Sequence, residues 1–420
     1  MKWWPDDPGF KLFRLEMISS VIGALISILL AKLWGTDWQG AWSVLNNFSS
    51  TVVVICTAGL PPVLISLIRR EGVHEPAMIR RFVYYFIFLF TLCIVALNFI
   101  SKTPDLAFLT SDIIQSGGGF VLLSIQIVLM VMINVAGAWM DAKNKQAYWT
   151  ALRLTMNIIL AIAIVMIYFL YRESPAVFLR RAWYAFILHA LITCLWLMFH
   201  LSGDRLVKME SNSNTHTILN MISQGGWIYL IADLFQRLNY RVDIWFLSAM
   251  QSNTQVGIYS VASSISLFLL IRSRNSQRVL INKFKVDDMA GNDLLIQTEV
   301  SLLAKQMIGF SLLFIAGAYG LFRFLGHHYM EGFPVLMVLT VGIYMISVTM
   351  PYSAYFIYIH APVKNLLAAG IGLLVNLGFN YMLIPSMGIW GAAVTSLLTY
   401  GAVGSVLYIS YKRSMLLWIP

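Results

Sequence analysis

Residues 38–44 read WQGAWSV, and residues 255–261 read QVGIYSV, 217 positions further along the chain. In this register Gly40 pairs with Gly257, and Ser43 pairs with Ser260. A second set of matches, at an offset of 219, includes the pair Asn157 and Asn376. Offsets close to half of a 420-residue chain predict a duplicated structural unit.

The sequence on either side of these motifs is strongly apolar. Hydrophobic residues make up 59% of the chain and charged residues 11%, and the mean hydropathy is +0.74. Soluble domains carry about 25% charged residues, so we expect a polytopic membrane protein. With about 20 apolar residues to a span, the sequence predicts twelve spans: 15–33, 41–68, 82–100, 119–140, 147–171, 179–201, 219–248, 255–282, 300–325, 333–359, 363–384 and 388–411.

The basic residues orient these spans. Twenty of the 29 lysines and arginines fall on one face and six on the other, and three lie within spans. The positive-inside rule therefore predicts that both termini are cytoplasmic. The net charge of +10 then reflects topology and contact with anionic membrane lipids, and we expect no nucleic-acid partner.

The repeat and the orientation together define an architecture. Six spans per half return the chain to its starting side, so the two halves share one orientation. We expect an all-α integral membrane protein of twelve transmembrane helices in two six-helix lobes, residues 1–210 and 211–420, related by a pseudo-two-fold axis along the membrane normal.

The loops and the cysteines exclude other classes of protein. A multipass polysaccharide polymerase or glycosyltransferase needs catalytic groups on a substantial external loop. The longest expected external loop, residues 101–118, offers only Asp105 and Asp112, so we do not expect an enzyme. Cys56, Cys93 and Cys194 lie in apolar runs without metal-ligand spacing, so we expect no metal site and no cofactor.

Three segments resemble a known family. They are RVDIWFLSAMQSNTQVGIYSVASSI (241–265), NLGFNYMLIPSMGIWGAAVTSLLTY (376–400) and TAGLPPVLISLIRREG (57–72). Together with the length and the twelve spans, they resemble the O-antigen, or Wzx-type, polysaccharide flippases. That family belongs to the multidrug/oligosaccharidyl-lipid/polysaccharide (MOP) exporter superfamily.

The resemblance implies a function. Such a protein moves undecaprenyl-pyrophosphate-linked oligosaccharide from the cytoplasmic to the periplasmic leaflet of the bacterial inner membrane by alternating access, with coupling to a proton or sodium gradient. Membrane lipids, a polysaccharide polymerase and a chain-length regulator are the other partners that it implies. It does not name the sugar.

A charged stretch in the expected seventh span, DLFQRLNYRVDIWFL (233–247), carries the candidate site. A charge at a helix centre costs about 2.5–3.5 kcal/mol on insertion scales, so such residues face water or partners. On one continuous helix, Asp233, Arg237 and Arg241 would form a stripe about 12 Å long, which Gln236 and Tyr240 widen.

Two interpretations of this stripe stay open. Arginine binds phosphate bidentately and keeps its charge, so Arg237 and Arg241 are candidates for contact with an anionic cargo. Asp233 and Asp243 are then candidates for ion coupling. Alternatively, Asp233 and Arg237 neutralise each other within the helix, and Arg241 with Asp243 anchors the external rim.

Further polar residues lie in other spans. Arg153 in the fifth span is a candidate for binding the cargo's pyrophosphate on the cytoplasmic side, with snorkelling to headgroups as the alternative. Glu16 in the first span is a third ion-coupling candidate. Asn157, Asn376 and Asn380 are expected to join helices by hydrogen bonds.

A small-molecule exporter of the related multidrug and toxin extrusion (MATE) family is the main alternative function. An exporter of cationic drugs should have an acidic interior, whereas the spans carry three arginines against Glu16, Asp233 and Asp243. The balance of charge favours an anionic cargo.

Overall fold

A computed structural model describes residues 8–57, 119–142, 145–171, 175–203, 227–285, 288–359 and 361–416. These residues are almost entirely helical, and no strand occurs among them. The expected third span, the family-like segment after its first residue, Thr57, and the start of the seventh span lie outside the described residues. The helices are α1 (Pro8–Thr57), α5 (Gly119–Ala142), α6 (Gln146–Tyr171), α7 (Pro175–Gly203), α9 (Trp227–Asn239), α10 (Val242–Met250), α11 (Asn253–Ser266), η3 (Leu267–Leu269), α12 (Leu270–Lys283), α13 (Met289–Leu325), η4 (His327–Glu331), α14 (Gly332–Tyr358), α15 (Pro362–Met387) and α16 (Ile389–Leu416).

Seven stretches of the described chain are long and apolar enough to cross a membrane. They are Val121–Met140, Tyr148–Tyr171, Asn253–Ile281, Met289–Leu325, His327–Tyr358, Pro362–Met387 and Ile389–Leu416. Each contains or closely matches a span predicted from the sequence. One start was wrong: α13 begins at Met289 rather than near residue 300, because the Asp288 side chain accepts a hydrogen bond from the Gly291 N–H at 2.9 Å and caps the helix.

Gly35 interrupts α1. Its backbone angles, φ 80° and ψ −179°, are non-helical and lie in a region that favours glycine. The break falls between the expected first and second spans, so the two parts of α1 correspond to two predicted helices.

The chain forms two compact units. The first consists of residues 1–26 and 45–227, and the second of residues 27–44 and 228–420. The predicted lobe boundary at residues 210 and 211 falls outside the described residues and stays a prediction.

The first unit contains α5, α6 and α7, which pack against one another. The buried Trp183 donates its indole N–H to Gln126 Oε1 at 2.6 Å, which joins α7 to α5. One side of α6 exposes large apolar residues, among them Ile162, Met166 and Phe169. A continuous apolar surface of this kind fits contact with lipid.

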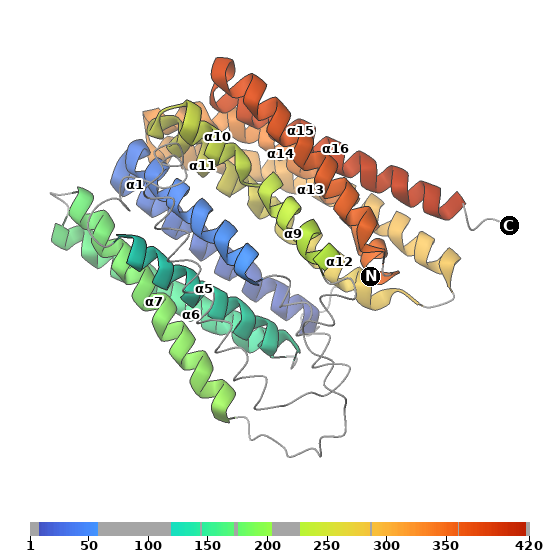
Figure 1. The fold of residues 1–420 in the computed structure, drawn as a ribbon, viewed down its shortest axis with the longest axis horizontal. Coiled ribbons are helices and arrows are strands. Elements are labelled where there is room, and N and C mark those ends of the chain that lie inside the picture. The colour runs from blue at the N-terminus through green and yellow to red at the C-terminus, as the bar shows by residue number, and fades with distance from the viewer. Residues whose placement is uncertain are drawn as a thin grey trace. The chain divides into compact units, whose positions relative to one another are not determined.

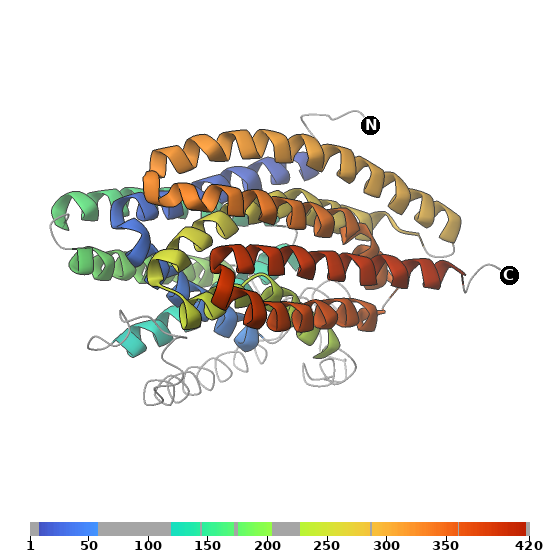
Figure 2. The ribbon, with the colours of Figure 1, turned by 90° about the horizontal axis from the view of Figure 1, so that it is seen from above.

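The second unit contains α9 to α16. Helices α14, α15 and α16 lie side by side (Figure 1), and α13 runs along α14 (Figure 2). Buried apolar residues such as Val335, Leu336 and Ile343 fill the interior of this unit. Leu313 and Leu374 are exposed on its outside, so this unit also presents apolar side chains outwards.

The expected seventh span is not one helix, which corrects the sequence prediction. Helix α9 ends at Asn239 and α10 begins at Val242, with a tight turn at Tyr240 and Arg241. In a continuous helix the Asn239 carbonyl would bond an N–H four residues on. Here it accepts a hydrogen bond from Asn376 Nδ2 at 3.2 Å, so the predicted stripe ends before Arg241.

Candidate functional site

Asp233 and Arg237 form an ion pair along α9. Arg237 Nε donates to Asp233 Oδ2 at 2.9 Å, and both side chains are more than half exposed, at 57% and 58%. The intrahelical pairing that the spacing allowed is therefore present. Pairs of this geometry contribute about 0.3–0.5 kcal/mol on exposed helices, so Arg237 can exchange Asp233 for a stronger anionic partner at little cost.

Three arginines gather around the turn between α9 and α10. The negative charge of Asp243 acts on Arg241 most strongly, and the positive charges of Arg237 and Arg274 act on it as well. Arg274, from α12, is exposed and holds its guanidinium carbon 5.6 Å from the centre of the Tyr240 ring. Like charges repel one another, so an anion beside the exposed Arg237 and Arg274 would lower their repulsion with Arg241.

Unsatisfied donors accompany these arginines. Within the described residues, the buried atoms Gln236 Nε2, Tyr240 OH and Asn275 Nδ2 have no hydrogen-bond partner. Gln236 precedes Arg237, Tyr240 precedes Arg241 and Asn275 follows Arg274 along the chain. Amide N–H groups and a hydroxyl donate hydrogen bonds to anionic oxygens, so these elements combine positive charge with spare donors.

Sequence analysis missed Arg274. It was assigned to the cytoplasmic face with the other basic residues, although it falls inside the expected span 255–282. That position was the available signal, since a charge inside a span has to be explained.

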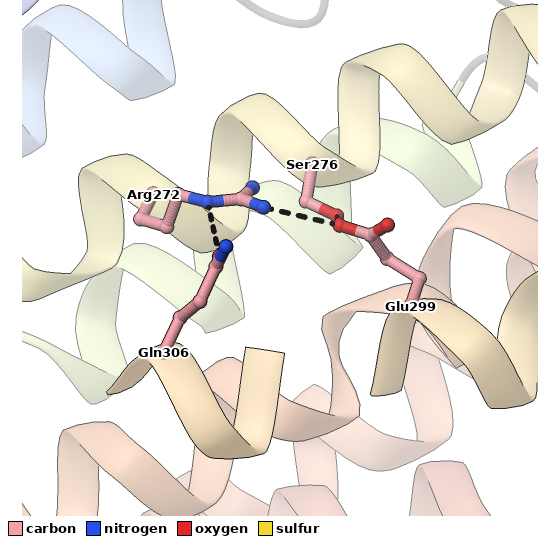
Figure 3. A network of polar contacts seen from close by, with 4 residues as sticks. All are labelled: Arg272, Ser276, Glu299 and Gln306. Atoms are coloured by element: carbon pink, nitrogen blue, oxygen red, sulfur yellow. Dashed lines mark hydrogen bonds and ion pairs between the residues drawn. The ribbon is translucent and has the colours of Figure 1, made fainter. Parts of the chain in front are cut away.

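A polar network fixes α12, which carries Arg274. Figure 3 shows Arg272 of α12 turned towards Glu299 and Gln306 of α13. Its Nη2 lies 3.4 Å from Glu299 Oε1, and its Nε donates to Gln306 Oε1 at 3.0 Å. Ser276 Oγ donates to the same glutamate oxygen at 2.5 Å. Arg272 therefore has partners on α13, whereas Arg274 is exposed two residues further on.

The opposite neighbour of α12 is α14. Ser273 Oγ donates to Ser347 Oγ at 3.2 Å, and Gln277 Nε2 donates to Ser353 Oγ at 3.1 Å. Contacts on two sides hold α12 in one orientation, and this orientation sets the position of Arg274 beside Tyr240.

Asp243 lies in a buried polar cluster two residues beyond Arg241, and the charges of these two residues attract each other. The residue is 1% exposed, at the start of α10. It accepts hydrogen bonds from the Tyr259 hydroxyl, from Ser396 Oγ at 3.1 Å and from the Ile244 N–H at 3.0 Å. A carboxylate is favourable at a helix N-terminus, but its burial does not fit an anchor at the membrane rim.

Asparagines join the helices beside this cluster. Asn239 Nδ2 donates to the Ala369 carbonyl of α15 at 3.0 Å, whereas Asn380 Nδ2 bonds within α15, to Asn376 Oδ1 at 2.6 Å. The expected hydrogen-bonding role of Asn376 between helices is confirmed, because it bonds the end of α9. All three asparagines are fully buried.

Several buried oxygen atoms in these elements lack a partner among the described residues. They are Asn239 Oδ1, Asn380 Oδ1, Thr395 Oγ1 and Thr399 Oγ1. Buried polar atoms are nearly always bonded, so each of these oxygens can accept a hydrogen bond from water or another donor. No group of three or more His, Cys, Asp or Glu side chains that could hold a metal occurs in the described part of the chain.

The predicted site residues divide between the two units. Asp233, Gln236, Arg237, Tyr240, Arg241 and Asp243 lie in the second unit. Arg153, an exposed residue of α6, and Glu16 of α1 lie in the first. The side chain of Glu16 is outside what the structure describes.

No family model and no curated protein matches this sequence. Solved structures do match over nearly the whole chain. The lipid II flippase MurJ, in an inward closed conformation, is 14% identical with a TM-score of 0.68, over 96% of this chain and 87% of its own. This chain has the fold of the MOP exporter superfamily.

Other solved structures share this fold. An outward-facing multidrug resistance MATE transporter matches with a TM-score of 0.60 and 11% identity, over 97% of this chain and 95% of its own. A MOP transporter from Pyrococcus furiosus, described as having a binding pocket of reverse polarity, matches with a TM-score of 0.55 and 13% identity, over 97% and 95%. The predicted all-α, twelve-helix, two-lobe membrane architecture is thereby confirmed.

Proposed function

We propose that this chain is a flippase that moves an undecaprenyl-pyrophosphate-linked oligosaccharide, the repeat unit of O-antigen or another surface polysaccharide, between the leaflets of a bacterial inner membrane. The grouping of Arg237, Arg241 and Arg274 around Tyr240 carries the proposal. Positive charge inside a membrane protein is expensive, and an anionic cargo offsets that cost. The fold shared with a lipid II flippase supports the same function.

In this proposal the arginines bind the pyrophosphate of the cargo or its acidic sugars. Guanidinium groups bind phosphate oxygens in pairs, and Gln236 and Tyr240 supply further hydrogen bonds. Arg153 binds the pyrophosphate as cargo enters from the cytoplasmic side. No catalytic group enters the proposal, because no covalent bond has to change.

Asp243 is the proposed site of ion coupling. A buried carboxyl bonded by a tyrosine and a serine discriminates strongly between its protonated, cation-bound and bare forms. Exchange of a proton or sodium ion there would change the hydrogen bonds between α10, α11 and α16. Asp233 and Glu16 are secondary candidates for ion coupling. Because Asp233 is already paired with Arg237, it is a less favoured candidate than Asp243.

The proposal includes a location and partners. The bias of basic residues supports cytoplasmic termini in the inner membrane. A polysaccharide polymerase and a chain-length regulator would receive the exported unit, and membrane lipids surround the apolar faces.

The test is translocation in proteoliposomes. Purified protein is reconstituted with a fluorescent undecaprenyl-pyrophosphate oligosaccharide, and an added glycosidase or membrane-impermeant quencher measures the outward leaflet. We expect protein-dependent exchange at least about tenfold above protein-free vesicles. Transport of a cationic drug with no movement of the lipid-linked sugar would support the MATE-like alternative, which the matched MATE structures favour equally as a fold, and would contradict the proposal.

A further inference from the structure

Helix α13 begins well before the span that the sequence predicts there. The helix runs from Met289 to Leu325, whereas the predicted span starts at residue 300. The part from residue 300 onwards is already long enough to cross a membrane, for which about 20 residues suffice. Residues 289–299, which we call the α13 extension, therefore serve another purpose.

Polar side chains tie the α13 extension to the elements around it. Asn292 bonds the backbone of Lys285 twice, accepting from its N–H at 3.1 Å and donating to its carbonyl at 2.8 Å. Tyr411 of α16 donates its hydroxyl hydrogen to Asp293. The extension is thus fixed both to the residues that follow α12 and to the end of α16.

Glu299, the last residue of the α13 extension, reaches α12. Its Oε1 atom accepts the Ser276 hydroxyl hydrogen and lies 3.4 Å from Arg272 Nη2 (Figure 3). The Arg272 and Glu299 side chains are only 17% and 14% exposed. Desolvation offsets much of the attraction in so buried an ion pair, so the pair is weak evidence for stability and is better explained by the one arrangement that it selects.

The direction in which Arg274 projects from α12 follows from this pair. Arg272 and Ser276 face α13, and Arg274 lies two residues from each of them, about 160° around the helix. Arg274 therefore projects away from α13, and its guanidinium carbon lies 5.6 Å from the centre of the Tyr240 ring. A rotation of α12 that separates Arg272 from Glu299 would carry Arg274 away from Tyr240.

We propose that the α13 extension orients α12, and that Glu299 is a positioning residue for anion binding that acts through Arg274. This inference rests on the proposed function, in which Arg274 binds the anionic cargo. Glu299 is itself negative and would repel a phosphate, so it contributes by holding α12 and not by contact with the cargo.

Binding of inorganic pyrophosphate to the purified protein in detergent tests the role of Glu299. Glu299→Gln keeps an acceptor for Ser276 but removes the charge that holds Arg272. We expect the dissociation constant to rise at least about fivefold in this variant, but to change less than about twofold when the substitution is added to Arg274→Ala, because the residue that it positions is then gone. Equal increases in both backgrounds, or no increase in either, would overturn the proposal.

Two further variants separate positioning from stability. Gln297→Leu is the matched control, since this exposed side chain of the extension bonds Asp293 within α13, at 2.6 Å, and its loss should leave the dissociation constant unchanged. The apolar pair Arg272→Met with Glu299→Leu should keep the midpoint of thermal unfolding and still bind pyrophosphate at least about fivefold more weakly. Wild-type affinity in the apolar pair would show that packing alone orients α12, which contradicts the proposal.

A second measurement needs no anion. Arg274→Cys is made in a chain whose native cysteines are replaced (Cys56→Ser, Cys93→Ser, Cys194→Ser), and reaction with a charged methanethiosulfonate reagent reports the exposure of position 274. This position is exposed in the structure, so rotation of α12 on addition of Glu299→Gln should slow the reaction at least about fivefold. An unchanged rate would overturn the proposal, whereas a slower rate in a protein that moves no lipid-linked oligosaccharide would contradict only the proposed cargo.

Discussion

At the scale of single residues, the charged side chains of the second unit differ in their exposure. Arg237 and Arg274 are exposed, whereas Asp243 is buried among hydroxyl groups. The sequence placed Asp233 and Asp243 on one helix as candidates for ion coupling, with Asp233 nearer mid-depth and Asp243 towards the external end. Burial distinguishes them. Asp233 is exposed and its charge is offset by Arg237, so binding of an ion would change it little, whereas the buried Asp243 carboxyl is sensitive to a bound proton or cation.

Asp243→Asn should therefore uncouple transport from the ion gradient. Asparagine keeps the size of the side chain and can still accept a hydrogen bond, but it binds neither a proton nor a cation by charge. We expect gradient-driven accumulation to fall at least about tenfold in proteoliposomes while gradient-free exchange persists. The matched control is Asp233→Asn, which should keep the response to the gradient. Loss of the response in Asp233→Asn protein but not in Asp243→Asn protein would contradict the assignment of ion coupling to Asp243.

At the scale of elements, the break between α9 and α10 depends on asparagines. Most helices of the described chain follow from the length of their apolar runs, and Asn376 was expected to bond across helices. The break was not predicted, because hydropathy does not reveal that Asn376 lies within reach of the Asn239 carbonyl. That information depends on three-dimensional packing, and it separates Arg241 from the helix of Arg237.

Asn376→Leu should destabilise this unit. The substitution leaves the Asn239 carbonyl and the Asn380 amide without their partner in a buried position, and a buried unpaired group costs about 1–3 kcal/mol. We expect a lower midpoint of thermal unfolding in detergent. Asn134→Leu is the control, since that exposed side chain bonds only its own helix, at Met130; equal midpoints for the two variants would contradict the role of Asn376.

At the scale of the whole molecule, the duplication was predicted from the seven-residue match between residues 38–44 and 255–261. Gly40 and Gly257 were paired in the sequence, and in the structure they lie at a close backbone crossing inside the second unit. Such glycines can be found in a sequence because a larger side chain would not fit where two helix backbones cross closely. The arginines proposed to bind the cargo are harder to find in the sequence, since Arg274 comes from a helix whose charges also fit the positive-inside pattern.

The central claim is that an anionic lipid-linked cargo is bound by the arginines around the α9–α10 turn. The most direct measurement is translocation of undecaprenyl-pyrophosphate oligosaccharide by proteoliposomes that contain Arg237→Ala, Arg241→Ala or Arg274→Ala protein, with Arg413→Ala at the exposed end of α16 as control. We predict a loss of about tenfold or more for each of the three variants and no loss for the control, with all four proteins folded by thermal unfolding. Wild-type rates in all three arginine variants would contradict the account.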